Sequence, residues 1–213
     1  MLDPEALRVM VVTSPGFRDR GHAELAGAAT HGVATAVQLR APELDDDALL
    51  VLARDLAARC REVGVLFIVN DRLEVAVASG ADGAHVGQSD APQDARSVLG
   101  PDRVLGISVA TPDDARDAVI FGADYLGVTV WSTATKPEAV PAGLDGLRAI
   151  VETTPLPVIG IGGIDAGNAA EVIRVGAEGV AVISAVADAP DPLAATRELR
   201  AAVEHAIDER EGS

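Results

Sequence analysis

The sequence predicts an α/β fold, a single (β/α)8 barrel of parallel strands that spans residues 1–213. Short apolar runs rich in Val and Ile alternate with amphipathic stretches, which is typical of repeated strand–helix units. Eight such units follow one another without a linker or a low-complexity segment. A weak glycine repeat, at residues 32–34, 80–82, 122–124 and 176–178, precedes every second strand. This count favours the closed TIM barrel over a doubly wound open sheet, which usually has fewer strands.

The expected strands are short runs bounded by glycine, by proline or by the signals of a helix start. Buried parallel strands are continuously apolar because helices cover them. In chain order they occupy residues 8–13, 34–40, 66–71, 83–87, 104–109, 125–130, 157–163 and 179–186.

Two of the intervening helices are marked by their termini. In residues 44–64, Asp45 to Asp47 lie at the start, where the helix dipole favours negative charge. In residues 111–122, Thr111 suits the N-cap, Pro112 the first turn and Gly122 the position after the C-cap. Both segments therefore predict helices with defined ends.

Composition excludes several classes of protein. A net charge of −16 argues against non-specific binding to nucleic acid or to an anionic membrane. The single cysteine, Cys60, excludes an internal disulfide, fits a reducing compartment and is expected to be a small buried residue of its helix. The first residues have no secretory signal pattern, and no apolar run approaches the roughly 18 residues of a membrane span. We therefore expect a cytoplasmic protein.

The barrel prediction directs the search for a site to the carboxyl ends of the strands, where barrel enzymes place their chemistry. On the second strand, Gln38 and Arg40 share one face, because side chains alternate along a strand. Val37 and Leu39 take the other face and should pack on helices. Gln38 and Arg40 are therefore expected to point into the barrel mouth, where a substrate anion or a neighbouring acid would pair with the arginine.

Two aspartates follow the third and fourth strands. Asp71 ends the third strand and Asp90 lies just past the fourth. Adjacent strands are about 4.8 Å apart, so both carboxylates can reach one cation. Mg²⁺ prefers one or two carboxylates together with water and phosphate oxygens, which suits a diphosphate substrate. The alternative is that both aspartates are helix N-caps.

A histidine and a glycine-rich turn mark two further strands. His85 shares its strand face with Gly87, which would leave room for a flat ring, although a lone histidine in an apolar strand is more often a core residue. Residues 159–164, IGIGGI, and the VISA segment that contains Ser184 would present backbone N–H groups after the seventh and eighth strands. This is the usual phosphate position in the fold.

The segment 131–137, WSTATKP, lies between these two expected anion sites. It contains Lys136, the only lysine among 17 basic residues. Codon bias explains the rarity of lysine but not the position of this one. We expect Thr133 and Thr135 to face one phosphate and Lys136 to meet a diphosphate.

Eight segments match one known family in order and in spacing: VQLR (37–40), VNDR (69–72), GAHVGQSD (83–90), LGIS (105–108), STATKP (132–137), GLDGL (143–147), IGIGGI (159–164) and GVAVISA (179–185). On these segments the chain resembles the thiamine phosphate synthase (thiamine-phosphate pyrophosphorylase) family. The resemblance implies that hydroxymethylpyrimidine diphosphate is joined to hydroxyethylthiazole phosphate with release of diphosphate and with Mg²⁺. It also implies that the C–O bond largely breaks first, so that the thiazole nitrogen captures a pyrimidinylmethyl cation.

The resemblance also implies roles for the residues at the rim. Arg40, Ser108 and Lys136 would be catalytic through their contacts with the diphosphate, and Asp71 and Asp90 would bind Mg²⁺. The substrate-binding residues would be Arg40, Asn70, Ser108 and Lys136 at the diphosphate, Gln38 and His85 at the pyrimidine, and Thr133, Thr135, Gly163, Ile183 and Ser184 at the thiazole phosphate.

Three departures from the family pattern qualify this expectation. Pro42 stands where the family usually has a lysine, Ala110 where it often has a histidine, and Val128-Thr129 where it has Gly-Pro. A working but slower synthase is our expectation. The alternatives are a thiazole tautomerase-like relative, which needs no diphosphate or metal site, and a non-catalytic barrel that binds thiazole phosphate. The sequence leaves a homo-oligomer open.

Overall fold

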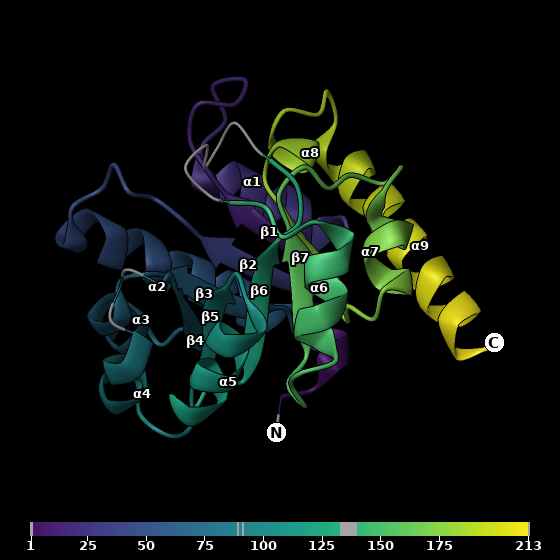
Figure 1. The fold of residues 1–213 in the computed structure, drawn as a ribbon. Coiled ribbons are helices and arrows are strands. Elements are labelled where there is room, and N and C mark those ends of the chain that lie inside the picture. Colours follow the sequence, from purple (N-terminus) through teal and green to yellow (C-terminus); the bar gives the residue numbers. More distant parts are fainter. Residues whose placement is uncertain (1, 89, 91, 133–139, 213) are drawn as a thin grey trace.

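The computed structural model describes residues 2–88, 90, 92–132 and 140–212. Eight parallel strands pair in chain order, and β8 returns to β1, so that the sheet closes into a barrel (Figure 1). The strands are β1 Val9–Thr13, β2 Ala36–Leu39, β3 Leu66–Asn70, β4 Gly83–Val86, β5 Val104–Val109, β6 Tyr125–Thr129, β7 Val158–Ile161 and β8 Gly179–Val182. The predicted (β/α)8 barrel is confirmed.

β5 has its predicted limits. The other strands begin or end one to four residues inside theirs, and backbone conformation explains the largest differences. β7 stops at Ile161 because Gly162 and Gly163 have φ angles of 92° and 66°, which no extended strand contains. β8 stops at Val182 because the chain turns there into a short helix that starts at Ser184. Both endings turn backbone toward the carboxyl rim of the barrel.

Helices surround the strands and connect each one to the next (Figure 1). They are a 3-10 helix Pro4–Leu7 and the α-helices α1 His22–His31, α2 Asp46–Glu62, α3 Leu73–Ser79, α4 Pro92–Leu99, α5 Pro112–Ile120, α6 Gly143–Val151, α7 Ala169–Arg174, α8 Ser184–Ala187 and α9 Pro192–Glu211. The predicted ends of α2 and α5 are confirmed. Asp45 caps α2 through Ala48 N–H at 2.9 Å, and Thr111 caps α5 in a capping box with Asp114.

Alternation along the strands divides the core into two apolar layers. Inside the barrel, Met10, Ile68 and Tyr125 belong to one buried cluster. Residues with the opposite parity, such as Val37 and Leu39, belong to a second cluster between the strands and the helices. The outward direction that we predicted for Val37 and Leu39 is therefore confirmed.

Two findings concern the expectations drawn from composition. Cys60 is buried on α2, as expected. Among the residues that the structure describes, no helix is both long enough and apolar enough to cross a membrane.

Candidate active site

A pocket opens at the carboxyl ends of the strands and contains about 870 Å³ of empty space, counting the part open to solvent. Every strand or the connection after it contributes to its wall, as in ligand sites of this fold. The lining residues are Val12, Gln38, Arg40, Asn70, His85, Ser108, Gly127, Thr129, Ile159, Ile161, Gly162, Gly163, Ile164, Ala181, Val182, Ile183 and Ser184.

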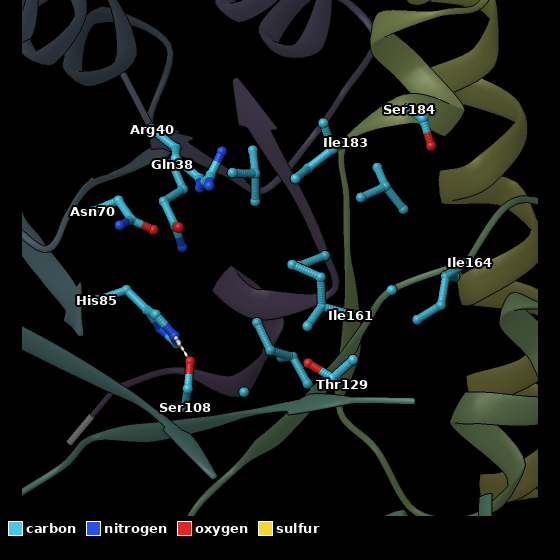
Figure 2. A pocket seen from close by; sticks show the side chains of 17 residues that line it. Gln38, Arg40, Asn70, His85, Ser108, Thr129, Ile161, Ile164, Ile183 and Ser184 are labelled. Carbon is cyan, nitrogen blue, oxygen red and sulfur yellow. Dashed lines mark hydrogen bonds between the residues drawn. The ribbon is translucent and has the colours of Figure 1, made fainter. Parts of the chain in front are cut away.

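Most of the site residues predicted from the sequence meet in this one pocket. Eight of them line it: Gln38, Arg40, Asn70, His85, Ser108, Gly163, Ile183 and Ser184. Figure 2 shows Gln38, Arg40, Asn70, His85 and Ser108 together on one side, with Ile183 and Ser184 across the pocket from them. The predicted residues Thr133, Thr135 and Lys136 lie outside the described residues.

Gln38 and Arg40 lie at the polar side, as their strand parity predicted. Gln38 is buried, and its Nε2 lies 3.3 Å from the sulfur of Met10, a weak acceptor. Arg40 is half-buried one residue beyond β2 and lines the pocket. An arginine at the mouth of a pocket supplies a fixed positive charge, because its guanidinium stays protonated at any physiological pH.

The sequence left open whether His85 is a core residue or a residue beside a bound ring, and the structure shows features of both. Its side chain is buried, with Nδ1 3.0 Å from the Tyr125 hydroxyl and Nε2 2.9 Å from Ser108 Oγ. It also lines the pocket, and Figure 2 shows its contact with Ser108 at the pocket wall. Complete burial raises the pKa of Tyr125, so its hydroxyl stays protonated and His85 always faces a neutral phenol.

Two glycines of the neighbouring strands make room for this histidine. A methyl group on Gly106 would lie 2.4 Å from His85 Nδ1 and 2.2 Å from Tyr125 Cζ. One on Gly127 would lie 3.0 Å from His85 Cε1. The imidazole therefore occupies space that strands β5 and β6 leave empty, and no other residue type fits at these two positions without movement.

Asp71 and Asp90 lie on neighbouring connections but are not among the residues that line the pocket. The Asp71 N–H donates to the carbonyl of His85 at 2.9 Å, which holds Asp71 beside the end of β4. The Asp90 carboxylate accepts the N–H of Gly87 at 3.1 Å. Arg72 occupies the N-cap position of α3, so Asp71 is not the cap of that helix.

These two carboxylates fit Mg²⁺ by the chemistry of their donors. No cluster of three or more His, Cys, Asp or Glu side chains occurs in the described part of the chain. Mg²⁺ needs only one or two carboxylates, because water and substrate phosphate complete its shell.

The opposite side of the pocket consists of backbone after β6, β7 and β8. Gly162 and Gly163 turn the chain after β7, and Asn168 Nδ2 donates to the carbonyl of Gly163 at 2.9 Å. Ile183 is the N-cap of α8, which begins at Ser184. Free N–H groups in such turns would suit an anion, which stays the prediction for this side of the pocket.

The chain on either side of residues 133–139 is attached to the end of β6. Before it, the Trp131 N–H donates to the carbonyl of Gly162 at 3.3 Å. After it, the N–H groups of Ala142 and Gly143 donate to the carbonyls of Thr129 and Val130 at 2.8 and 3.0 Å. The described residues on either side of 133–139 are thus attached to the end of β6 and to the glycine turn after β7.

Several lining residues, among them Thr129, Ile161 and Ile164, were not predicted individually, although Ile161 and Ile164 belong to the predicted segment 159–164 (Figure 2). Their signal was present in the alternation of the strands. Tyr125, Gly127 and Thr129 have one parity on β6, and Tyr125 lies in the inner cluster, so Thr129 also faces inward.

Comparisons with known proteins agree on one activity. The profile of the thiamine monophosphate synthase family matches residues 9–186. The thiamine-phosphate synthase of Moorella thermoacetica is 49% identical over 92% of this chain and 95% of its own length, and that of Chloroflexus aurantiacus is 48% identical over 92% of both. The solved thiamine phosphate pyrophosphorylase of Pyrococcus furiosus covers 96% of this chain and 98% of its own, with a TM-score of 0.89 and 38% identity.

Proposed function

Because this chain belongs to the thiamine monophosphate synthase family and is a transferase that forms thiamine phosphate, we propose that its pocket joins hydroxymethylpyrimidine diphosphate to hydroxyethylthiazole phosphate. The pyrimidine diphosphate would occupy the side next to β2–β5, and the thiazole phosphate the side next to β7 and β8. Diphosphate is the leaving group.

One observation carries this proposal: two kinds of anion-binding group face each other across a single pocket. Arg40, Asn70 and Ser108 supply a cation and polar side chains at one side. Gly163, Ile183 and Ser184 supply turns of backbone and a hydroxyl at the other. A reaction between two phosphorylated substrates requires this separation, because two anions in one subsite would repel each other.

The side chains between the two anion subsites suit a flat ring. Gln38 and His85 offer hydrogen-bonding edges, and the isoleucines of β7 offer an apolar surface. The His85 imidazole is fixed by Tyr125 and Ser108, so it would lose little entropy when a substrate binds. Orienting the thiazole nitrogen toward the pyrimidine methylene carbon is the main task of these residues.

Departure of the diphosphate is an electrostatic problem. We infer that Arg40, Ser108 and Lys136 stabilise the charge that develops on the leaving oxygen, since preorganised charges and donors act most strongly where water is excluded. Asp71 and Asp90 would hold Mg²⁺, which would supply further positive charge next to the diphosphate. The carboxylates themselves would keep this ion at the connections after β3 and β4.

The direct test is to incubate the pure protein with both substrates and Mg²⁺, with and without EDTA, and to follow thiamine phosphate. We expect product with Mg²⁺ and little or none after chelation. No product under any condition would contradict the synthase proposal, whereas product that is insensitive to EDTA would contradict only the metal assignment. A cytoplasmic location remains a prediction, which fractionation would check. The sequence leaves the oligomeric state open, and light scattering would determine it.

A further inference from the structure

A series of hydrogen-bonded polar side chains, two of them buried, lies behind Arg40 on the outer side of the barrel wall. Thr13, the last residue of β1, is fully buried, and its Oγ1 lies 2.8 Å from His22 Nδ1. His22 is the first residue of α1, and its Nε2 lies 2.8 Å from the Glu43 carboxylate. None of these three side chains lines the pocket.

These hydrogen-bonded side chains contact both ends of the connection that begins with Arg40. The backbone N–H of Arg40 points at Thr13 Oγ1 at 3.4 Å, a long hydrogen bond. Glu43 lies three residues further on, and Leu44 N–H closes a turn on the carbonyl of Ala41 at 3.2 Å. The residues from Arg40 to Glu43 are therefore held at both ends by side chains that also bind each other.

A count of hydrogen-bond donors and acceptors assigns the protons of Thr13 and His22. Thr13 Oγ1 receives the Arg40 N–H, so its own proton is available for His22 Nδ1. The proton of the neutral imidazole then lies on Nε2 and is donated to Glu43. If His22 were charged, its Nδ1–H would donate to Thr13, whose proton would have no acceptor among the described residues, and a buried hydroxyl without an acceptor is costly.

We propose that Thr13, His22 and Glu43 form a relay of hydrogen bonds that positions Arg40 for the diphosphate of the pyrimidine substrate. All three are positioning residues, because they act through Arg40 and do not reach the pocket. The inference rests on the proposed function of Arg40 at that substrate.

The composition of the connection explains why Arg40 would need such support. Pro42 has replaced the lysine that the family usually has, so the described connection contains one cation, Arg40. Partial burial on its own would raise the pKa of Glu43, but the hydrogen bond from His22, a backbone hydrogen bond and the charge of Arg40 lower it. Glu43 therefore stays ionised and attracts the guanidinium that must also meet the substrate.

The test measures the affinity of inorganic diphosphate with Mg²⁺ by calorimetry in Thr13→Val, Glu43→Ala and wild-type protein. Thr13→Val removes the hydroxyl at constant shape, and Glu43→Ala removes the last acceptor. We expect each to weaken diphosphate binding about tenfold, the scale of one lost buried hydrogen bond. The KM for the thiazole phosphate should stay within about twofold of the wild-type value, because its subsite lies across the pocket. Thr13→Ser should restore most of the affinity.

A matched control is available on α9, where His205 and Glu209 form an exposed ion pair at 3.3 Å. His205→Ala should leave diphosphate affinity and both KM values unchanged. Nitrogen-15 NMR supplies an independent readout, since neutral His22 should carry its proton on Nε2 in the wild-type protein and lose this fixed tautomer in Thr13→Val.

The outcomes separate the relay from the proposed function. Unchanged diphosphate affinity in Thr13→Val and Glu43→Ala, or a His22 proton on Nδ1, would overturn the relay alone. Wild-type protein that binds no diphosphate and forms no product would overturn the proposed function and the relay with it. If Thr13→Val fails to fold, Glu43→Ala decides, because the Glu43 side chain is 40% exposed and its loss is tolerated by the core.

Discussion

At the residue scale, Lys136 is the side chain on which the proposed chemistry depends most. With Pro42 in place of the usual lysine, Arg40 and Lys136 are the two protein cations expected at the diphosphate. Lys136→Ala should lower kcat by a factor that corresponds to roughly 3–4 kcal/mol, the scale for losing one preorganised stabiliser of developing charge. Steady-state kinetics would measure it.

Lys136→Arg tests the same position more finely. A planar guanidinium does not replace a compact ammonium at a crowded phosphate, so we expect this variant to lose much of the rate as well. A fully active Lys136→Arg enzyme would mean that the identity of this lysine is incidental.

Gly106 has no side chain, and the space this leaves is occupied by the rings of Tyr125 and His85. In Gly106→Ala the new methyl group would collide with Tyr125 and His85, both buried, so the free energy of unfolding should fall by roughly 1–3 kcal/mol. Gly27→Ala is the control, because no atom lies within 4 Å of its added methyl group, and an alanine inside α1 should stabilise by about 0.5–1 kcal/mol. Equal stabilities of the two variants, measured by denaturant unfolding, would contradict this assignment.

At the element scale, the start of α5 illustrates a helix terminus whose stability depends on pH. Asp114 accepts the N–H groups of Ala110 and Thr111 and an N–H of Gln88 at 2.8–3.0 Å. Partial burial alone would raise the pKa of Asp114. These hydrogen bonds, together with one to the side chain of Thr111, lower it. A depressed carboxyl pKa stabilises the fold above the usual value of about 4, and this stability is lost as the pH falls below it.

Asp114→Ala should therefore lower the free energy of unfolding by about 1 kcal/mol at neutral pH, as expected for a lost cap. The difference from wild type should shrink as the pH falls below about 4, because protonation removes the same interaction from the wild-type protein. Asp113→Ala, in the same helical turn but at an exposed side chain, should show neither effect. Urea unfolding over a pH series would distinguish the two variants.

The ends of helices were predicted from the sequence more accurately than the ends of the last two strands. Thr111 and Gly122 predicted both ends of α5 correctly, because caps are local interactions between residues a few positions apart. The limits of β7 and β8 were predicted too far along the chain. Apolar runs such as VISAV do not reveal where a strand gives way to a short helix, since Ile and Val suit both.

At the scale of the whole molecule, Cys60 reports on the integrity of the barrel. It is buried on α2 among the residues that pack on the strands, and this burial, with a smaller contribution from the charge of Asp82, raises the pKa of its thiol to about 11. The thiol should therefore react very slowly with a thiol reagent at pH about 8 in the folded protein. In denaturant, one equivalent should react at once.

When reclosing is faster than modification, the rate of that reaction in the folded protein should be proportional to the population of molecules in which the core is open. It should rise when Gly106→Ala destabilises the fold. We expect it to be unaffected by Lys136→Ala, because Lys136 is predicted to bind substrate and not to belong to the core. Rapid modification of the native wild-type protein would contradict the burial of Cys60.

The sequence by itself determined the strand count, the closed barrel, the inward parity of Gln38 and Arg40, and eight of the 17 residues that line the pocket. These follow from local periodicity, and parallel strands in chain order bring their carboxyl ends together without further information. The tertiary structure alone revealed the contacts between residues distant in sequence: Tyr125 with His85, the space that Gly106 leaves for both, and the relay from Thr13 through His22 to Glu43. No periodicity encodes these partners, because their geometry depends on how strands and helices of different units pack against one another.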